Sequence, residues 1–451
     1  MRTRAVARAA GIAVAALSTA VATALTPSVA QAGDTFYSYS GPTDLAALAP
    51  GTVLDVRTVP FHLTEVPTPL TAIQVLYRST DALGNAVANV TSVIRAAGAG
   101  PARGVVSYQS AYDSLNPEDS PSRAVAGDIQ IGGFTGSGRN LAVGGLFFSA
   151  EVTGFALLLA QGFSIVVPDT EGQQANFAAG PEYGMNTLDS LRAVARVPET
   201  GIAPGTRTAL MGYSGGAIAS NWAAILAPEY APEIAAQLIG VAQGGLLAVP
   251  AHTLRYASGS VAWAGVVGMA LVGISRSYAI DVEQYLSDYG RQVFARLRDA
   301  SIINVFLQYP GLTWQQMVLP QYADPNSIPE FTAVANAINM GLAPIPTIPM
   351  LVHQGTGGIF EGTAPGGPGL GDGDGIMIAG DVRALLNRYC ATGLPVRYRE
   401  LPLLSHGAVV PIWALETLAW VNARFAGEPA PTSCGQIAPG NSLAAEVDSG
   451  G

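Results

Sequence analysis

The sequence feature that most constrains this chain is a short turn, Gly212-Tyr213-Ser214-Gly215-Gly216, between two segments of different character. Residues 206–212 are apolar and suit a buried strand, whereas residues 217–226 are rich in alanine and suit a helix. The pattern G-x-S-x-G is weak alone, because an ordinary glycine-rich turn can match it. A strand before it and a helix after it indicate a nucleophile elbow, a strained turn that exposes the serine hydroxyl. The sequence therefore predicts Ser214 as a nucleophile.

Other short apolar segments follow the same pattern of strands separated by helical stretches. Residues 86–94 and 73–77 read as a strand pair, and residues 186–197 have helical character. The remaining predicted strands are residues 104–108, 163–169, 238–241, 349–353 and 396–401. Strands that alternate with helices over this length predict an α/β protein, with a mostly parallel central sheet flanked by helices on both faces.

The chain divides by composition into five expected parts. These are a signal peptide (1–32), a first part of the core (33–245), a helical cap or lid insertion (246–343), a second part of the core (344–435) and a flexible C-terminal tail (436–451). In the insertion, a capping box from Asp281 to Gln284 is expected to begin a helix. The apolar face of this helix would consist of Val282, Leu286, Tyr289, Val293 and Leu297. A further packed helical layer is the alternative to a cap.

The N-terminus has the pattern of a secretory signal. Arg2, Arg4 and Arg8 precede an apolar stretch, and Ala30-Gln31-Ala32 is a small-x-small cleavage site, so a secreted mature chain would begin at Gly33. A retained membrane anchor is the alternative. Export favours a disulfide between the two cysteines of the chain, Cys390 and Cys434, over two unpaired thiols.

The charge pattern limits the partners. All 22 basic residues are arginine, they are scattered, and the formal net charge is −10. Nucleic acid and anionic lipid both need clustered cations, so neither is expected, and transient contact with a lipid interface would use apolar side chains. Two cysteines and four histidines at unrelated spacings predict no metal site, and no cofactor is expected. The oligomeric state is not predicted.

A serine nucleophile needs a base and an acid. In the chain order Ser, acid, His, the base is His406, which follows the last strand by a short loop; His353 ends a strand and would be a neighbour of the site. The acid is expected in the glycine-rich loop after residues 349–353, which offers Glu361, Asp372 and Asp374. A calcium loop at residues 371–375 would lack the other ligands of a recognised motif.

The sequence resembles the secretory lipase family, the Candida antarctica lipase A type of α/β-hydrolase. Segments that carry the resemblance are residues 212–220 and 228–233, Ser107-Tyr108-Gln109, Tyr112-Asp113-Ser114, Pro168-Asp169, Glu171-Gly172, Arg388-Tyr389-Cys390, Gly393 and Ser405-His406. It covers about residues 70–430. The resemblance implies the α/β-hydrolase fold with a helical cap that supplies an acyl-chain pocket, for which residues 261–274 are apolar enough.

The resemblance also assigns the acid and the oxyanion hole. In the family the acid opens an Asp-Glu-x-x-Pro stretch, and Asp374 occupies that place, although this chain has Gly375 for the glutamate and a longer loop before the acid. Asp372 and Glu361 are the reserves. The implied oxyanion donors are the backbone of Gly215 and a loop residue that matches Asp113, for which a turn-capping aspartate is the alternative.

The expected activity is hydrolysis of carboxylic esters of lipids by a secreted serine hydrolase, a triacylglycerol lipase or carboxylesterase. Alternatives with the same triad are an acyltransferase, a polyester depolymerase and a serine peptidase. A non-catalytic lipid-binding protein with the same fold is the remaining alternative; it would lack a member of the triad.

Overall fold

A computed structural model of the 451-residue chain describes residues 35–96, 102–367 and 369–449. The predicted signal peptide, residues 1–32, lies outside these ranges. Within them no helix is long and apolar enough to cross a membrane.

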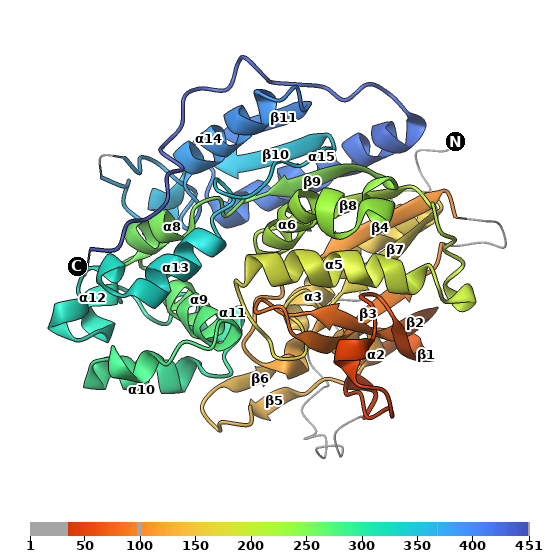
Figure 1. Ribbon diagram of the computed structural model, residues 1–451, viewed down its shortest axis with the longest axis horizontal. Helices are drawn as coiled ribbons and strands as arrows, with labels where there is room; N and C mark the ends of the chain where they lie inside the picture. The colour runs from red at the N-terminus through yellow and green to blue at the C-terminus, as the bar shows by residue number, and fades with distance from the viewer. Residues whose placement is uncertain (1–34, 97–101, 368, 450–451) are drawn as a thin grey trace.

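One large sheet forms the centre of the molecule (Figure 1). Its strands are β1 (Val53–Leu63), β2 (Val66–Thr80), β3 (Ala86–Ile94), β4 (Gly104–Gln109), β7 (Phe163–Pro168), β8 (Thr208–Tyr213), β9 (Leu238–Gly244), β10 (Met350–Gly355) and β11 (Val396–Leu401). Their spatial order is β1-β2-β3-β7-β4-β8-β9-β10-β11. The pairs from β7 to β11 are parallel, and β1 to β3 continue the sheet as antiparallel strands. A mostly parallel sheet is therefore confirmed.

Helices cover both faces of the sheet, because the central strands are apolar on both sides. The core helices are α2 (Pro121–Ala126), α3 (Leu146–Glu151), α4 (Phe155–Ala160), α5 (Gly180–Val194), α6 (Gly215–Tyr230), α7 (Pro232–Ala235), α14 (Ala379–Cys390) and α15 (His406–Ala426). In β8, Leu210 joins the apolar cluster under α5, α6 and α14, while Ala209 and Met211 face the cluster under α4 and α15. This alternation is the two-residue period of a strand.

The segment between β9 and β10 is helical. It contains α8 (Pro250–Ala257), α9 (Ala264–Ser277), η6 (Val282–Gln284), α10 (Asp288–Leu297), α11 (Ile302–Val305), α12 (Trp314–Met317), η7 (Pro320–Tyr322), η8 (Pro325–Ser327) and α13 (Pro329–Ala337). These helices share an apolar cluster to which core residues such as Leu115, Phe177 and Ile376 also belong, and they lie together beside one end of the sheet (Figure 1). Their behaviour as a cap or lid stays a prediction.

Two small hairpin strands and the chain ends complete the fold. Strands β5 (Ile131–Phe134) and β6 (Leu141–Val143) pair outside the main sheet. The expected disulfide between Cys390 and Cys434 is present and links the end of α14 to the segment after α15.

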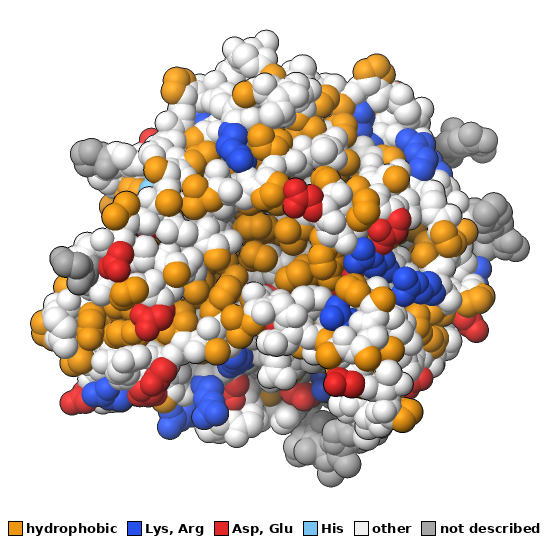
Figure 2. Space-filling view, in the orientation of Figure 1, with side chains coloured by type: hydrophobic (Ala, Val, Ile, Leu, Met, Phe, Trp, Pro, Cys, Tyr) orange, Lys and Arg blue, Asp and Glu red, His pale blue; other side chains and the backbone are white. Residues whose placement is uncertain are grey.

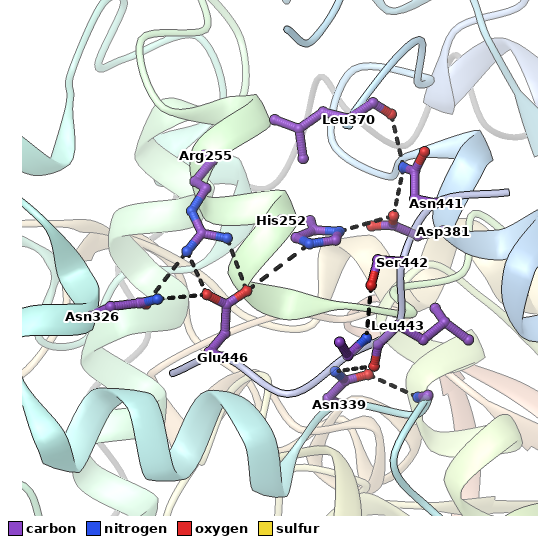
Figure 3. A network of polar contacts seen from close by, with 12 residues as sticks. His252, Arg255, Asn326, Asn339, Leu370, Asp381, Asn441, Ser442, Leu443 and Glu446 are labelled. Carbon is purple, nitrogen blue, oxygen red and sulfur yellow. Dashed lines mark hydrogen bonds and ion pairs between the residues drawn. The ribbon is translucent and has the colours of Figure 1, made fainter. Parts of the chain in front are cut away.

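The C-terminal segment, residues 436–449, lies across α14 and the helical insertion (Figure 3). Asn441 donates to Asp381 of α14 at 2.7 Å, and Glu446 forms an ion pair with Arg255 of α8. His252 of α8 lies between these two contacts, with its Nδ1 3.0 Å from Asp381. The segment predicted to be a flexible tail thus connects the insertion to the core through polar contacts.

Candidate active site

Ser214 occupies a strained turn between β8 and α6. Its φ and ψ are 55° and −118°, a conformation that a residue with a side chain rarely adopts. A Cβ at Gly216 would lie 2.0 Å from the carbonyl oxygen of Gln109, so only glycine fits there. Glycine two residues after the serine therefore lets the turn pass close to β4, and Ser214 lies between strand β8 and helix α6.

Ser214, His406 and Asp374 form a continuous hydrogen-bonded chain. The Oγ of Ser214 lies 2.8 Å from Nε2 of His406, and Nδ1 of the same ring lies 2.8 Å from Oδ2 of Asp374. His406 is 4% exposed and Asp374 is fully buried. Burial of Asp374 therefore shields its contact with His406 from water, and the arrangement can move a proton from the serine to the imidazole.

The local backbone holds Asp374 in place. Its Oδ1 accepts from the backbone N–H groups of Ile376 at 3.1 Å and Met377 at 2.8 Å. Its Oδ2 accepts from the side-chain amide of Gln354 at 2.9 Å as well as from His406. Asp372, a reserve for the acid, is exposed and has no such contact with His406. The carboxylate that faces the imidazole is therefore preorganised by four donors.

The charges around His406 favour its protonated form. Burial alone would lower the pKa of the imidazole, but the carboxylates of Asp374, Glu361 and Asp113 outweigh burial, and the pKa is raised above its usual value. The hydroxyl of Tyr213 donates to the carbonyl oxygen of His406 at 2.6 Å and fixes the backbone there. The imidazolium that forms on proton transfer is thus electrostatically stabilised.

Asp113 lies beside the serine turn. A Cβ at Gly215 would be 1.9 Å from Oδ1 of Asp113, so the glycine makes room for this carboxyl. Burial raises the pKa of Asp113 to about 7, and its Oδ1 has no hydrogen-bond partner among the described residues. The adjacent backbone N–H groups of Ala111 and Ser114 donate to Glu151 and Glu171.

The N–H groups of Gly215 and Asp113 are the expected oxyanion donors. The first lies in the opening turn of α6, where an N–H has no acceptor within the helix itself. The positive end of the helix dipole favours negative charge at this position. Asp113 has a positive φ of 34°, which sets the loop after β4 apart from ordinary extended backbone. The assignment of both residues to an oxyanion hole stays a prediction.

Two apolar cavities meet at Ser214. The narrow cavity, about 80 Å³, is lined partly by side chains of α8 and α9, such as Leu254, Val267 and Ile274. The wide cavity, about 670 Å³, is lined by α4, α11 and α15 and also reaches His406. Ser214, Asp113 and Trp263 line both cavities. An ester bond at Ser214 could therefore extend one substituent into each cavity.

His353 lies away from Ser214, and Glu361 lines the wide cavity without taking the place of Asp374. His353 is buried in β10, where its Nε2 is 2.8 Å from Glu416 of α15, and it lines neither cavity. Glu361 contacts Trp263 rather than Nδ1 of His406. Trp263 and the supporting amide of Gln354 could not be predicted from the sequence, because no local pattern marks either residue. Among the described residues, no group of three or more His, Cys, Asp or Glu side chains is arranged to hold a metal ion.

The sheet, the turn at Ser214 and the connection of His406 after the last strand define the α/β-hydrolase fold. Two solved structures of Candida antarctica lipase A share this fold. One has a TM-score of 0.72 and 23% identity, covering 91% of this chain and 89% of that chain. The other, in its closed state, has a TM-score of 0.73 and 23% identity, covering 93% of both chains.

Sequence comparison gives the family. A family model described as Secretory lipase matches residues 139–433. A probable inactive lipase of Mycobacterium tuberculosis is 30% identical over 397 residues, which cover 87% of this chain and 82% of the relative. Lipase 6 of Candida albicans is 29% identical over 411 residues, covering 88% and 82%. The chain belongs to the secretory lipase family, which confirms the resemblance predicted from the sequence.

Proposed function

We propose that this protein is a secreted hydrolase of lipid esters that uses Ser214 as nucleophile, His406 as general base and acid, and Asp374 as the residue that orients His406. The observation that carries the proposal is the buried hydrogen-bonded chain from Asp374 through His406 to Ser214, located where two apolar cavities meet. Family membership supports the same reaction class. One relative bears the name of a probable inactive lipase, so family membership alone does not imply activity. The proposal therefore rests on the presence of Ser214, His406 and Asp374 in this chain.

The reaction would proceed in two steps. Ser214 Oγ attacks the ester carbonyl while His406 Nε2 takes its proton, and the imidazolium then protonates the departing alcohol. The backbone N–H groups of Gly215 and Asp113 would stabilise the oxyanion, and losing one such donor costs about 10²–10³-fold in kcat in other hydrolases. Water, deprotonated by His406, then attacks the acyl-enzyme and releases the acid, which restores Ser214.

The cavities support an apolar ester as substrate. We assign the acyl chain to the narrow cavity, because its small volume and apolar lining suit a single hydrocarbon chain, and the rest of the lipid to the wide cavity.

Contact with a lipid interface would use apolar side chains around the wide cavity. Phe147, Ile303 and Val410 line this cavity and are 37–44% exposed. The face shown in Figure 2 carries many hydrophobic side chains with charges of both signs scattered among them. This pattern fits docking by apolar contact better than docking by charge.

Ser214→Ala tests the proposal directly. The wild type should hydrolyse p-nitrophenyl esters and become labelled by a fluorophosphonate, and the variant should lose both properties while its thermal unfolding stays unchanged. Wild-type protein that folds, binds lipid and takes no label would instead support a non-catalytic binding protein. Product analysis with an added alcohol separates hydrolysis from acyl transfer, since transfer would yield the new ester.

Secretion is part of the proposal and rests on residues 1–32 of the sequence. Expression of the full chain in an exporting host should release protein whose N-terminal residue is Gly33. An uncleaved chain that remains with the membrane would support the anchor alternative.

A further inference from the structure

Glu361 connects the insertion to the helix that begins at His406. It ends the short helix η9 (Gly358–Glu361), in the long loop that precedes Asp374. Its Oε2 accepts from the indole Nε1–H of Trp263 at 2.7 Å, and its Oε1 accepts from the backbone N–H of Gly407 at 3.3 Å. One carboxylate therefore joins three segments of the chain beside His406.

Trp263 forms part of the wall between the two cavities. Its side chain is buried at the start of α9, and it lines both cavities where they meet at Ser214. Its ring packs edge-on against the imidazole of His406, with centroids 5.0 Å apart, and against Phe306 at the same separation. Any movement of this ring changes both the packing on His406 and the shape of each cavity next to Ser214.

Further hydrogen bonds keep these loops in register. The backbone N–H of Val261 donates to the carbonyl oxygen of Gly362 at 3.1 Å. The hydroxyls of Ser260 and Thr363 lie 2.6 Å apart, and Thr363 donates to the carbonyl oxygen of Gly375 at 2.6 Å. The part of the loop around Glu361 is thus connected to the insertion and also to the later part of the same loop, which contains Asp374.

Gly375 provides the space for the pair. A Cβ at this position would lie 2.6 Å from Nε1 of Trp263 and 2.8 Å from Oε2 of Glu361, and its φ is +130°. Any side chain at position 375 would have to displace the indole or the carboxylate, so the glycine leaves the room that the Glu361–Trp263 pair occupies.

We propose that Glu361 is a positioning residue: by accepting the indole N–H it holds Trp263 against His406 and fixes the wall between the acyl and leaving-group cavities. This inference rests on the proposed function of Ser214. Its carboxylate is also one of three that face His406, together with Asp374 farther along the same loop and Asp113 from the loop after β4, while Tyr213 contacts the backbone carbonyl. Removing the charge of Glu361 lowers the pKa of the imidazole, because one source of stabilisation for the cation is lost.

Three variants separate the hydrogen bond from the charge. Glu361→Gln keeps an acceptor for the indole and loses the charge, Glu361→Ala loses both, and Trp263→Phe keeps an aromatic ring and loses the N–H donor. The measurements are kcat and KM as functions of pH for p-nitrophenyl esters of short, medium and long acyl chains. Glu283→Gln, an exposed acid in η6, is the matched control and should equal the wild type.

The variants should give different patterns. Glu361→Gln should keep the wild-type ratio of kcat/KM between long and short esters, while the acid limb of its kcat/KM profile moves to lower pH. Glu361→Ala should show the same movement and also change that ratio by about 10-fold, because the wall is no longer fixed. Trp263→Phe should change the ratio and leave the acid limb where it is.

Other results would overturn the inference. Wild-type protein without fluorophosphonate labelling would remove the proposed function and this inference with it. An active, labelled wild type whose Glu361→Ala variant has the same acid limb and the same ratio would overturn this inference alone. If Glu361→Ala does not fold, the comparison of Glu361→Gln with Trp263→Phe decides, since identical behaviour of the two would also contradict it.

Discussion

At the scale of single residues, the contacts of Asp374 assign it the task of fixing the orientation of His406 as well as its charge. One oxygen is occupied by two backbone N–H groups, and the other accepts from Gln354 and faces Nδ1 of His406. Nδ1 must therefore carry the proton, which leaves Nε2 free to accept from Ser214. This is the tautomer that a general base needs.

Asp374→Asn should therefore reduce kcat by about 10⁴-fold, as such a change does in other serine hydrolases. The amide would turn its NH₂ toward His406 and Gln354, which places donors against donors and favours the wrong tautomer. The acid limb of any residual activity should move to lower pH, because a carboxylate that raises the pKa of His406 is gone. Asp372→Asn is the control; a large loss there, with Asp374→Asn active, would contradict the assignment.

Candidate site residues could be proposed from the sequence alone only where a local sequence pattern marks them. Ser214 could be predicted because its turn requires a strand, small neighbours and a helix in consecutive order. The acid could not be chosen by pattern, since the path of a glycine-rich loop has no periodicity, and the family resemblance favoured Asp374 over Glu361. The contact between Glu361 and Trp263 joins residues 98 positions apart, so nothing local could have indicated it.

At the scale of elements, strands were more predictable than the helices of the insertion. Residues 86–94 and 396–401 match β3 and β11 in full. The expected helix from Val282 is wrong in its first part. The side chain of Ser287 accepts from the N–H of Gly290 at 3.0 Å and starts α10 there, while Leu286 forms a bridge with Val318. A stronger N-cap later in the chain thus displaced the predicted one.

Helix α9 supplies much of the lining of the narrow cavity. Val266, Val267, Ala270, Leu271 and Ile274 of this helix line it, and Ala270 is the smallest of them. Ala270→Phe should fill much of the cavity, whose volume is about 80 Å³.

The ratio of kcat/KM for long against short acyl esters should then fall about 100-fold or more, because several methylene groups lose their site. Ala414→Phe, at the wide cavity, should change selectivity for the alcohol part and leave this ratio nearly unchanged. If Ala414→Phe altered acyl-chain selectivity and Ala270→Phe did not, the two cavities would have to exchange their assignments.

At the scale of the whole molecule, the C-terminal segment joins parts of the chain that the sheet alone does not connect. Glu446 accepts from Arg255 of α8 and from Asn326 of η8 (Figure 3). The backbone N–H and carbonyl groups of Glu446 form hydrogen bonds with the side chain of Asn336 in α13. On the other side, the disulfide at Cys434 connects this segment to α14. The segment therefore links the insertion to the second part of the core through hydrogen bonds and an ion pair.

This connection should depend on pH. The hydrogen bond from Arg255 is the main cause that lowers the pKa of Glu446 to about 2, from an ordinary value of 4.5. A carboxyl whose pKa is lower in the folded state stabilises the fold above its unfolded pKa, and that contribution is lost as the pH falls from about 4.5 through about 2. At neutral pH the contribution is fully present.

Glu446→Gln should therefore lower the melting temperature at pH 7, and the difference from the wild type should shrink steadily between pH 4.5 and pH 2. Thermal unfolding across this range, followed by intrinsic fluorescence, measures the difference. Glu283→Gln removes an exposed carboxylate from the same insertion and should leave the curve unchanged. If the difference in melting temperature between Glu446→Gln and the wild type is constant with pH, the substitution destabilises the protein through altered packing. The ion pair with Arg255 then does not hold the insertion to the core.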